Sequence, residues 1–113
     1  MVAVKSNCLK RFRYEVTAVS HDPKVINLFN EWMVAEHGQD VLSCKGCLEF
    51  RLIAIDEHTS RSEYLFTSEE AFQDYEVNDA PRLRQRGIEY FSGLDIQFSR
   101  ASSSLIAEGR RTL

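Results

Sequence analysis

The chain has 113 residues, of which 43% are hydrophobic and 27% are charged, and its formal net charge at pH 7 is −3. This length and composition are typical of a single globular domain with one core. The slightly acidic balance provides no overall positive field for nucleic-acid phosphates, so we expect no nucleic-acid partner. No stretch approaches the roughly 18 to 20 apolar residues of a membrane span, and the N-terminus lacks the apolar segment of a secretory signal. We therefore expect a cytoplasmic protein with no membrane partner.

The sequence contains three cysteines, Cys8, Cys44 and Cys47. An odd number at this low density argues against a secreted disulfide framework and agrees with a reducing compartment. Cys44 and Cys47 have the C-x-x-C spacing of a redox dithiol or of half a zinc site. A redox pair opens a helix, whereas this pair is predicted to open a strand, and no second pair of zinc ligands has a recognised spacing. We expect packed cysteines, no metal and no cofactor, with a redox pair or a zinc site as the alternatives.

Periodicity in the first half of the chain predicts one strand and one helix. Residues 1–10 show no sustained period and are predicted to form a flexible N-terminal leader. Residues 11–19 alternate apolar and polar side chains, which indicates a strand. Asp22 can cap a helix that begins at Pro23, and apolar residues at helical spacing continue toward Gly38, where we expect this helix to stop.

Periodicity in the second half predicts two further strands, a broken helix and a last strand. Residues 47–56 and 62–67 indicate a hairpin. Ser68 can cap the following helix, which Pro81 interrupts and restarts. Residues 94–99 alternate again and predict the final strand.

The order strand, helix, strand, strand, helix, strand is that of a ferredoxin-like βαββαβ sandwich, which is an α+β fold. In this topology the first and third strands pair at the centre of the sheet, and both helices cover one face. We place the domain at residues 11–100, followed by a C-terminal tail of weak pattern at 101–113.

The two faces of the predicted sheet differ in polarity. An apolar set forms the core opposite Trp32 and Phe72. This set comprises Phe12, Tyr14, Val16, Leu48, Phe50, Leu52, Tyr64, Phe66, Leu94, Ile96 and Phe98. The other face mixes charged and apolar side chains, namely Arg13, Glu15, Thr17, Glu49, Arg51, Ile53, Ile55, Leu65, Asp95 and Gln97. Such a face is either solvated or packed on a second copy of the chain, and its apolar residues favour a homodimer.

Short motifs occur along the predicted domain. The most specific is Ala80-Pro81-Arg82-Leu83-Arg84, with Gly87 and Phe91 after it. The others are Tyr14-Glu15-Val16, Trp32, His37, Gly46-Cys47, Ser68, Ala71 and Tyr75. From Arg11 to Arg100 this set resembles a family of small bacterial proteins of unknown function. The resemblance implies a ferredoxin-like dimeric α+β barrel and a homodimer, and it brings no catalytic residues. The wider group of dimeric barrels includes cofactor-independent monooxygenases, haem-handling enzymes and stress-induced proteins, and is related by architecture only.

Four residues are candidates for a functional site. Glu15, Glu49 and Arg51 share the mixed sheet face, where carboxylates and a guanidinium would orient a polar ligand if a partner enclosed them. The alternative is a structural ion pair across the strands. His37 is the catalytic candidate, because an imidazole suits proton transfer near neutral pH. Its alternative role is to cap the first helix, where a histidinium meets the carbonyl end of the helix dipole.

A basic cluster of Arg82, Arg84 and Arg86 follows Pro81. Residues two apart do not share a helix face, and acidic residues lie close in the sequence. A solvated surface is therefore favoured over an anion site for this cluster.

No motif of high catalytic specificity occurs: there is no glycine-rich phosphate loop, H-E-x-x-H, G-x-S-x-G or aromatic RNA-binding signature. Whether the protein is an enzyme is left open by the sequence. One hypothesis is a small barrel protein that binds a small polar or aromatic molecule, with or without cofactor-independent catalysis. The alternative is a non-catalytic dimeric protein-interaction module. A ligand-sized cavity in the dimer, roughly 300 to 1,000 Å³, would favour the first.

Overall fold

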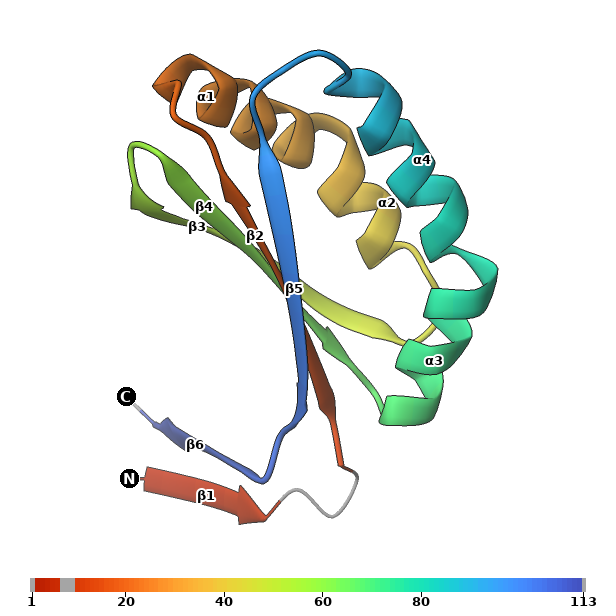
Figure 1. The fold of residues 1–113 in the computed structure, drawn as a ribbon. Coiled ribbons are helices and arrows are strands. Elements are labelled where there is room, and N and C mark those ends of the chain that lie inside the picture. The colour runs from red at the N-terminus through yellow and green to blue at the C-terminus, as the bar shows by residue number, and fades with distance from the viewer. Residues whose placement is uncertain (1, 7–9, 113) are drawn as a thin grey trace.

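The main body of the protein has two layers, a four-stranded antiparallel sheet and helices that cover one of its faces (Figure 1). This computed structural model describes residues 2–6 and 10–112 of the chain, and side chains from residue 10 onward. The strands of the sheet are β2 (Phe12–Val19), β3 (Cys47–Asp56), β4 (Thr59–Phe66) and β5 (Gln97–Ser104). The helices are α1 (Pro23–Trp32), a π-helical turn (Met33–His37), α2 (Gly38–Leu42), α3 (Glu69–Asn78) and α4 (Ala80–Tyr90). No helix in these described residues is long and apolar enough to cross a membrane.

The strand order is β3-β4-β2-β5, with every neighbouring pair antiparallel. The first and third strands of the βαββαβ unit, β2 and β4, therefore lie at the centre, as the topology predicts. The predicted ferredoxin-like α+β fold is confirmed. The register places Glu63 of β4 between Glu15 of β2 and Arg51 of β3.

Both predicted helix starts are confirmed by their caps. The Asp22 carboxylate accepts a hydrogen bond from the Lys24 backbone N–H at 2.9 Å, and Pro23 occupies the first helical position. The Ser68 hydroxyl accepts one from the Ala71 backbone N–H at 3.0 Å. These short polar side chains satisfy N–H groups that the first turn of a helix leaves without partners.

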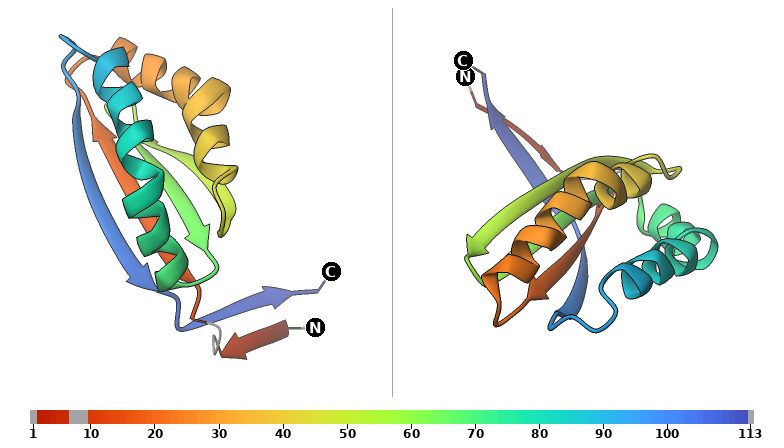
Figure 2. Two further views of the ribbon diagram at one scale, coloured as in Figure 1. Left: turned by 90° about the vertical axis from the view of Figure 1, so that its right-hand side faces the viewer. Right: turned by 90° about the horizontal axis from the view of Figure 1, so that it is seen from above.

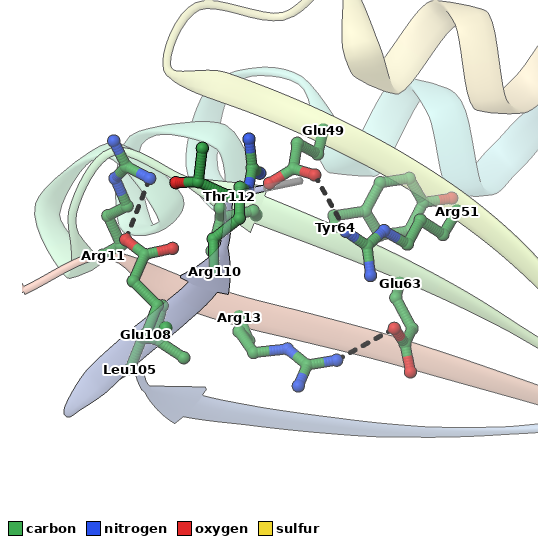
Figure 3. A pocket seen from close by; sticks show the side chains of 12 residues that line it. Arg11, Arg13, Glu49, Arg51, Glu63, Tyr64, Leu105, Glu108, Arg110 and Thr112 are labelled. Atoms are coloured by element: carbon green, nitrogen blue, oxygen red, sulfur yellow. Dashed lines mark hydrogen bonds and ion pairs between the residues drawn. The ribbon is translucent and has the colours of Figure 1, made fainter. Parts of the chain in front are cut away.

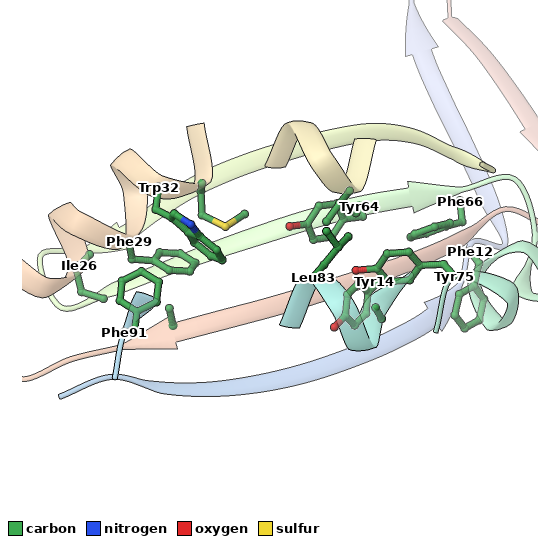
Figure 4. Close-up of a cluster of buried hydrophobic side chains, with 14 residues drawn as sticks. Phe12, Tyr14, Ile26, Phe29, Trp32, Tyr64, Phe66, Tyr75, Leu83 and Phe91 are labelled. Carbon is green, nitrogen blue, oxygen red and sulfur yellow. The ribbon is translucent and has the colours of Figure 1, made fainter. Parts of the chain in front are cut away.

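The core lies between the sheet and the helices and is rich in aromatic rings (Figure 4). Its buried residues include Phe12, Tyr14, Phe29, Trp32, Met33, Tyr64, Phe66, Tyr75, Leu83 and Phe91. Phe50, Leu52, Phe72 and Ile96 pack against this cluster and are partly buried. Most of the predicted apolar set is therefore in the core, opposite Trp32 and Phe72.

The first helical segment does not stop at Gly38, contrary to the prediction. Gly38 has helical backbone angles, φ −59° and ψ −42°, and α2 continues from it. A Cβ atom at Gly38 would lie 2.4 Å from a ring carbon of Phe50 on β3. The missing side chain therefore allows the helix to approach the sheet closely, which is a reason for glycine that a sequence pattern does not distinguish from a helix stop.

Three strand predictions were wrong in detail. Leu48, predicted in the core, is 44% exposed because the pairing of β3 with β4 shifts register between Cys47 and Glu49. The hairpin is tighter than expected, since β4 already begins at Thr59. The last strand begins at Gln97 and continues through serines that carry no apolar alternation.

A second, two-stranded sheet projects from the main body and brings the two termini side by side (Figures 1 and 2). It pairs β1 (Val2–Ser6) with β6 (Ala107–Arg111). The sequence predicted a flexible leader at residues 1–10 and a tail of weak pattern at 101–113, and it did not indicate this pairing. The pairing joins backbone groups about one hundred residues apart and needs no apolar alternation, so neither segment shows the pattern of a strand on its own. The domain limits at 11–100 stay a prediction.

Candidate functional site

A cavity of about 270 Å³ lies between the sheet and the helices, and we call it the inner cavity. Side chains from three strands, β2, β4 and β5, line one side of it. Side chains from α1, the π-helical turn, α3 and α4 line the other side. The cavity thus lies within one chain, where the two layers meet, and not on the mixed face where the sequence predicted a site.

Aromatic rings form much of the wall. Tyr14 stacks on Tyr64 with ring centroids 5.7 Å apart, and Tyr75 lies 6.3 Å from Tyr14. Trp32 lines the same cavity from α1. Figure 4 shows the hydroxyl groups of the three tyrosines turned toward the Trp32 side of the core. Such a wall presents both flat apolar surface and hydrogen-bonding groups to a ligand.

His37 faces this cavity from the end of the π-helical turn. Its ring stacks on Trp32 with centroids 4.5 Å apart and planes 18° from parallel. Its Nδ1 is buried without a hydrogen-bond partner among the described residues. The alternative of a helix-capping role is wrong, because the helix continues past His37. Single π-helical turns occur often at functional sites, where they redirect a side chain.

The pKa of His37 is lowered to about 4, mainly by burial; Asp40 opposes this effect, and the positive charges of Arg84 and Arg100 add to it. The imidazole is therefore neutral at pH 7. In this state one ring nitrogen can accept a proton or a hydrogen bond from a ligand.

Two arginines meet at the hydroxyl of Tyr14. The guanidinium of Arg84 donates to the Tyr14 oxygen at 2.9 Å, and Nε of Arg100 donates to the same oxygen at 3.1 Å. Arg84 also forms an ion pair with Glu76. Burial opposes the charge of Arg84, but its hydrogen bonds to Glu76 and Tyr14 outweigh that effect and raise its pKa. Arg84 thus stays charged beside the aromatic wall.

The sequence did not single out Arg84 or Arg100 as site residues. The predicted cluster of three arginines separates in the structure: Arg82 pairs with Asp79 and Arg86 with Asp40, each at 3.2 Å, while Arg84 lines the inner cavity. The helical spacing separates them, since residues two apart point in different directions.

A second, larger hollow of about 810 Å³ lies on the opposite face of the sheet, beside the β1–β6 ribbon, and we call it the outer groove (Figure 3). Its lining carries four arginines and three glutamates: Arg11, Arg13, Arg51, Arg110, Glu49, Glu63 and Glu108. Arg11 pairs with Glu108 at 3.0 Å, and Arg13 pairs with Glu63 at 2.9 Å.

The structure brings two of the three predicted ligand-binding residues into the outer groove. Glu49 and Arg51 line it and pair with each other at 3.3 Å, and 66% of the Arg51 side chain is open to solvent in the single chain. Glu15 does not line the groove and instead accepts a hydrogen bond from Arg13 at 3.3 Å. Glu63 of β4 pairs with Glu15 on one side and with Arg51 on the other, so it lies between these two residues. A ligand-binding role for these three residues stays a prediction.

The two described cysteines are free thiols that pack against backbone oxygens. Cys44 Sγ donates to the Asp40 carbonyl at 3.3 Å, and Cys47 Sγ donates to the Glu49 carbonyl at 3.6 Å. Burial raises the pKa of Cys44 and raises that of Cys47 to about 11, so neither is a ready thiolate. Within the described part of the chain no group of three potential metal ligands gathers. Cys8 lies outside the described residues.

This sheet order, with all main helices on one face, defines the protein as a ferredoxin-like α+β protein of the kind found in dimeric barrels. Residues 11–101 match the family model described as a domain of unknown function, DUF4286, and the chain belongs to this family. No curated protein is matched.

Similar solved structures extend over nearly the whole chain at low identity. A dimeric ferredoxin-like protein from an uncultured marine organism has a TM-score of 0.70 at 13% identity, and the match covers 89% of this chain and 99% of that one. The ActVA-Orf6 monooxygenase of Streptomyces coelicolor, solved with nanaomycin D, has a TM-score of 0.66 at 18% identity, covering 93% and 92%. SnoaB, a cofactor-independent oxygenase from Streptomyces nogalater, has a TM-score of 0.63 at 11% identity, covering 92% and 97%. The chain thus shares its fold with such monooxygenases, and fold alone does not transfer their activity.

Proposed function

We propose that this protein binds a small aromatic molecule in the inner cavity, and that His37 accepts a hydrogen bond or a proton from it. One observation carries the proposal: His37 lines an aromatic-walled cavity, and its Nδ1 is buried without a hydrogen-bond partner among the described residues. A buried polar atom that lacks a partner costs about 1 to 3 kcal/mol, and a ligand that donates to it would recover that cost.

The size of the cavity limits the ligand. Its volume of about 270 Å³ is near the lower end of ligand pockets, which begin at roughly 300 Å³. One or two fused rings fit such a space better than a large polycyclic molecule. One of the oxygenases among the structural neighbours was solved with a bound ligand. This supports the proposal because it shows that the same fold can hold a ligand.

A neutral His37 can accept a hydrogen bond, and it becomes a better proton acceptor if a bound anion raises its pKa from about 4 toward neutral pH. The ligand would present an acidic O–H or C–H group to the ring nitrogen, and the arginines beside Tyr14 would stabilise the negative charge left behind. This is the form of cofactor-independent catalysis that the residues of the cavity support.

The test uses Trp32, which lines the cavity and is the only tryptophan of the chain. In the ¹⁵N-labelled protein it gives a single indole N–H resonance. We expect that resonance to shift in a saturable way when the neutral aromatic amide cinnamamide is titrated in.

Val16 of β2 also lines the cavity, and Val16→Phe should fill the space and weaken binding at least tenfold. Val77→Phe is the matched control, because Val77 is 74% exposed on α3 and lies outside the cavity lining. An equal shift in Val16→Phe would contradict the proposal and favour the interaction-module alternative, and so would the absence of a shift with both cinnamamide and its charged analogue cinnamate.

We also propose that the chain forms a homodimer through the outer sheet face. The support is the mixture of charged and apolar residues on that face, where Ile53 pairs with Arg61 and Leu65 pairs with Glu49 across the strands. A structural neighbour described as dimeric supports it as well.

A further inference from the structure

We infer that the ligand of the inner cavity is an aromatic acid whose carboxylate is bound by the guanidinium of Arg100 beside Tyr14. This inference rests on the proposed function, because it names the chemical class of the ligand for the same cavity.

The first support is the hydrogen bonding of Arg100. Its Nε donates to the Tyr14 hydroxyl oxygen at 3.1 Å, which fixes one edge of the guanidinium. No carboxylate among the described side chains lies within ion-pair distance of Arg100. The two terminal nitrogens are therefore available to form two parallel hydrogen bonds to a carboxylate.

The second support is the charge balance around this end of the cavity. Arg84 is paired with Glu76, and Arg86 is paired with Asp40. Both of these arginines have a carboxylate partner, whereas Arg100 has none among the described side chains. Arg100 borders the cavity from the edge strand β5 and is solvent-exposed, so water partly screens its charge, and the planar guanidinium would bind an anion through directed hydrogen bonds as well as through charge.

The third support is the unused donor of Tyr14. A phenol has one hydrogen to donate and accepts up to two hydrogen bonds. Arg84 and Arg100 occupy both accepting positions on the Tyr14 oxygen. The hydroxyl hydrogen has no acceptor among the described residues, and a carboxylate oxygen beside Arg100 would provide one.

The shape of the cavity selects the rest of the ligand. The stacked rings of Tyr14 and Tyr64, with Tyr75 and Trp32, form flat walls that fit a planar ring. A planar guanidinium matches a planar carboxylate in geometry. An aromatic carboxylate meets both requirements within about 270 Å³.

The test compares cinnamate with cinnamamide, which have the same ring and length and differ in charge. Dissociation constants are measured from the Trp32 indole resonance at pH 7. We expect cinnamate to bind at least tenfold more tightly than cinnamamide, since a charge-assisted pair contributes more than a neutral hydrogen bond. In Arg100→Gln this preference should disappear, and in Arg100→Lys it should fall to an intermediate value because the charge remains without the planar fork.

Arg82→Gln is the control, because Arg82 pairs with Asp79 and does not line the cavity. It should keep the preference for cinnamate. Equal binding of both probes, or a preference that survives in Arg100→Gln, overturns this inference and leaves the proposed cavity intact. If neither probe shifts the Trp32 resonance, the proposed function fails together with the inference.

Discussion

His37 illustrates how the setting of a single residue decides its chemistry. The same imidazole at an exposed helix end would be half charged near pH 6.5 and would stabilise the helix dipole. Here the helix continues past it, its ring stacks on Trp32, and burial lowers its pKa to about 4. The residue that the sequence identified as a candidate therefore faces a cavity, in a protonation state that the sequence does not reveal.

The lowered pKa predicts how stability depends on pH. The unfolded chain binds a proton at His37 below about pH 6.5, whereas the folded chain binds it only below about 4. Between these values the unfolded state holds more protons, so the free energy of unfolding falls as pH falls from 6.5 to 4. The loss is on the order of 3 kcal/mol at most.

Urea denaturation at a series of pH values measures this effect. The variant His37→Gln removes the titrating group, so its stability should fall less over the same pH range than that of the natural chain. Direct NMR titration of the ring should give a pKa near 4. A pKa near 6.5, or equal pH dependence in both proteins, would show that the imidazole is solvated.

Binding of a ligand anion should change the pKa of His37. The charges that act on His37 come from Arg84 and Arg86 on α4, Arg100 on β5 and Asp40 on α2. A bound carboxylate beside Arg100 adds a negative charge to this set and raises the pKa of His37. At a pH close to this raised pKa, proton uptake by His37 would accompany binding of an acid, which links the two proposals for the cavity.

Among the elements, the α1–α2 segment and β3 show how close packing overrides propensity. Glycine inside a helix costs about 1 kcal/mol relative to alanine, so propensity alone predicts that Gly38→Ala stabilises the protein. The structure predicts the opposite sign. A Cβ atom would lie 2.4 Å from the Phe50 ring and 2.7 Å from the Met33 carbonyl oxygen.

We expect Gly38→Ala to lower the free energy of unfolding by roughly 1 to 3 kcal/mol, the usual cost of overpacking a core. The shift of the urea denaturation midpoint measures this loss of stability. In a Phe50→Leu background, where the ring is gone, the same substitution should cost less. A stabilised Gly38→Ala variant would mean that the helix stands farther from the sheet.

The elements that sequence predicted well are those that carry their own local signals. Asp22 with Pro23, and Ser68, cap their helices as expected, because a cap depends on residues within one turn. Leu48 was misplaced because a register shift depends on the partner strand, which the pattern of one strand does not contain. The β1–β6 ribbon was missed for a similar reason, since its pairing depends on a distant segment.

The candidate site was predictable only in part. His37 was identified from its chemistry, whereas Arg100 required the correct length of the last strand. Phe98 and Arg100 are two apart on β5 and pair with Ala18 and Val16 of β2, so both project toward the helices. Extending the period-two pattern past Phe98 would have placed Arg100 on the core face, but the expected strand ended at residue 99.

On the scale of the whole molecule, the sheet separates two hollows of different character. The inner cavity is small and rich in aromatic rings, and the outer groove is larger and lined by charged pairs. The inner cavity is complete within one chain. The outer groove lies between the main sheet and the β1–β6 ribbon, and a second copy of the sheet would cover its open side.

Dimer formation through the outer face is the prediction at this scale. Size-exclusion chromatography with light scattering at micromolar concentration should give twice the 13.0 kDa mass of one chain. A stable interface of this kind buries on the order of 1,600 Å² in total. A mass equal to one chain would contradict the prediction.

A substitution at Ile53 tests which face forms the interface. Ile53 pairs with Arg61 on the outer side of β3, so Ile53→Glu would bury a carboxylate against the partner and should raise the dimer dissociation constant at least tenfold. Val77→Glu adds the same charge at a position that is 74% exposed on α3, within the helix layer, and should leave the dimer intact. If Val77→Glu dissociates the dimer and Ile53→Glu does not, the helices form the interface instead.

If the outer sheet face does form the dimer, Glu49 and Arg51 become enclosed between two sheets. Only in that dimer can they have the ligand-binding role that the sequence predicts for them.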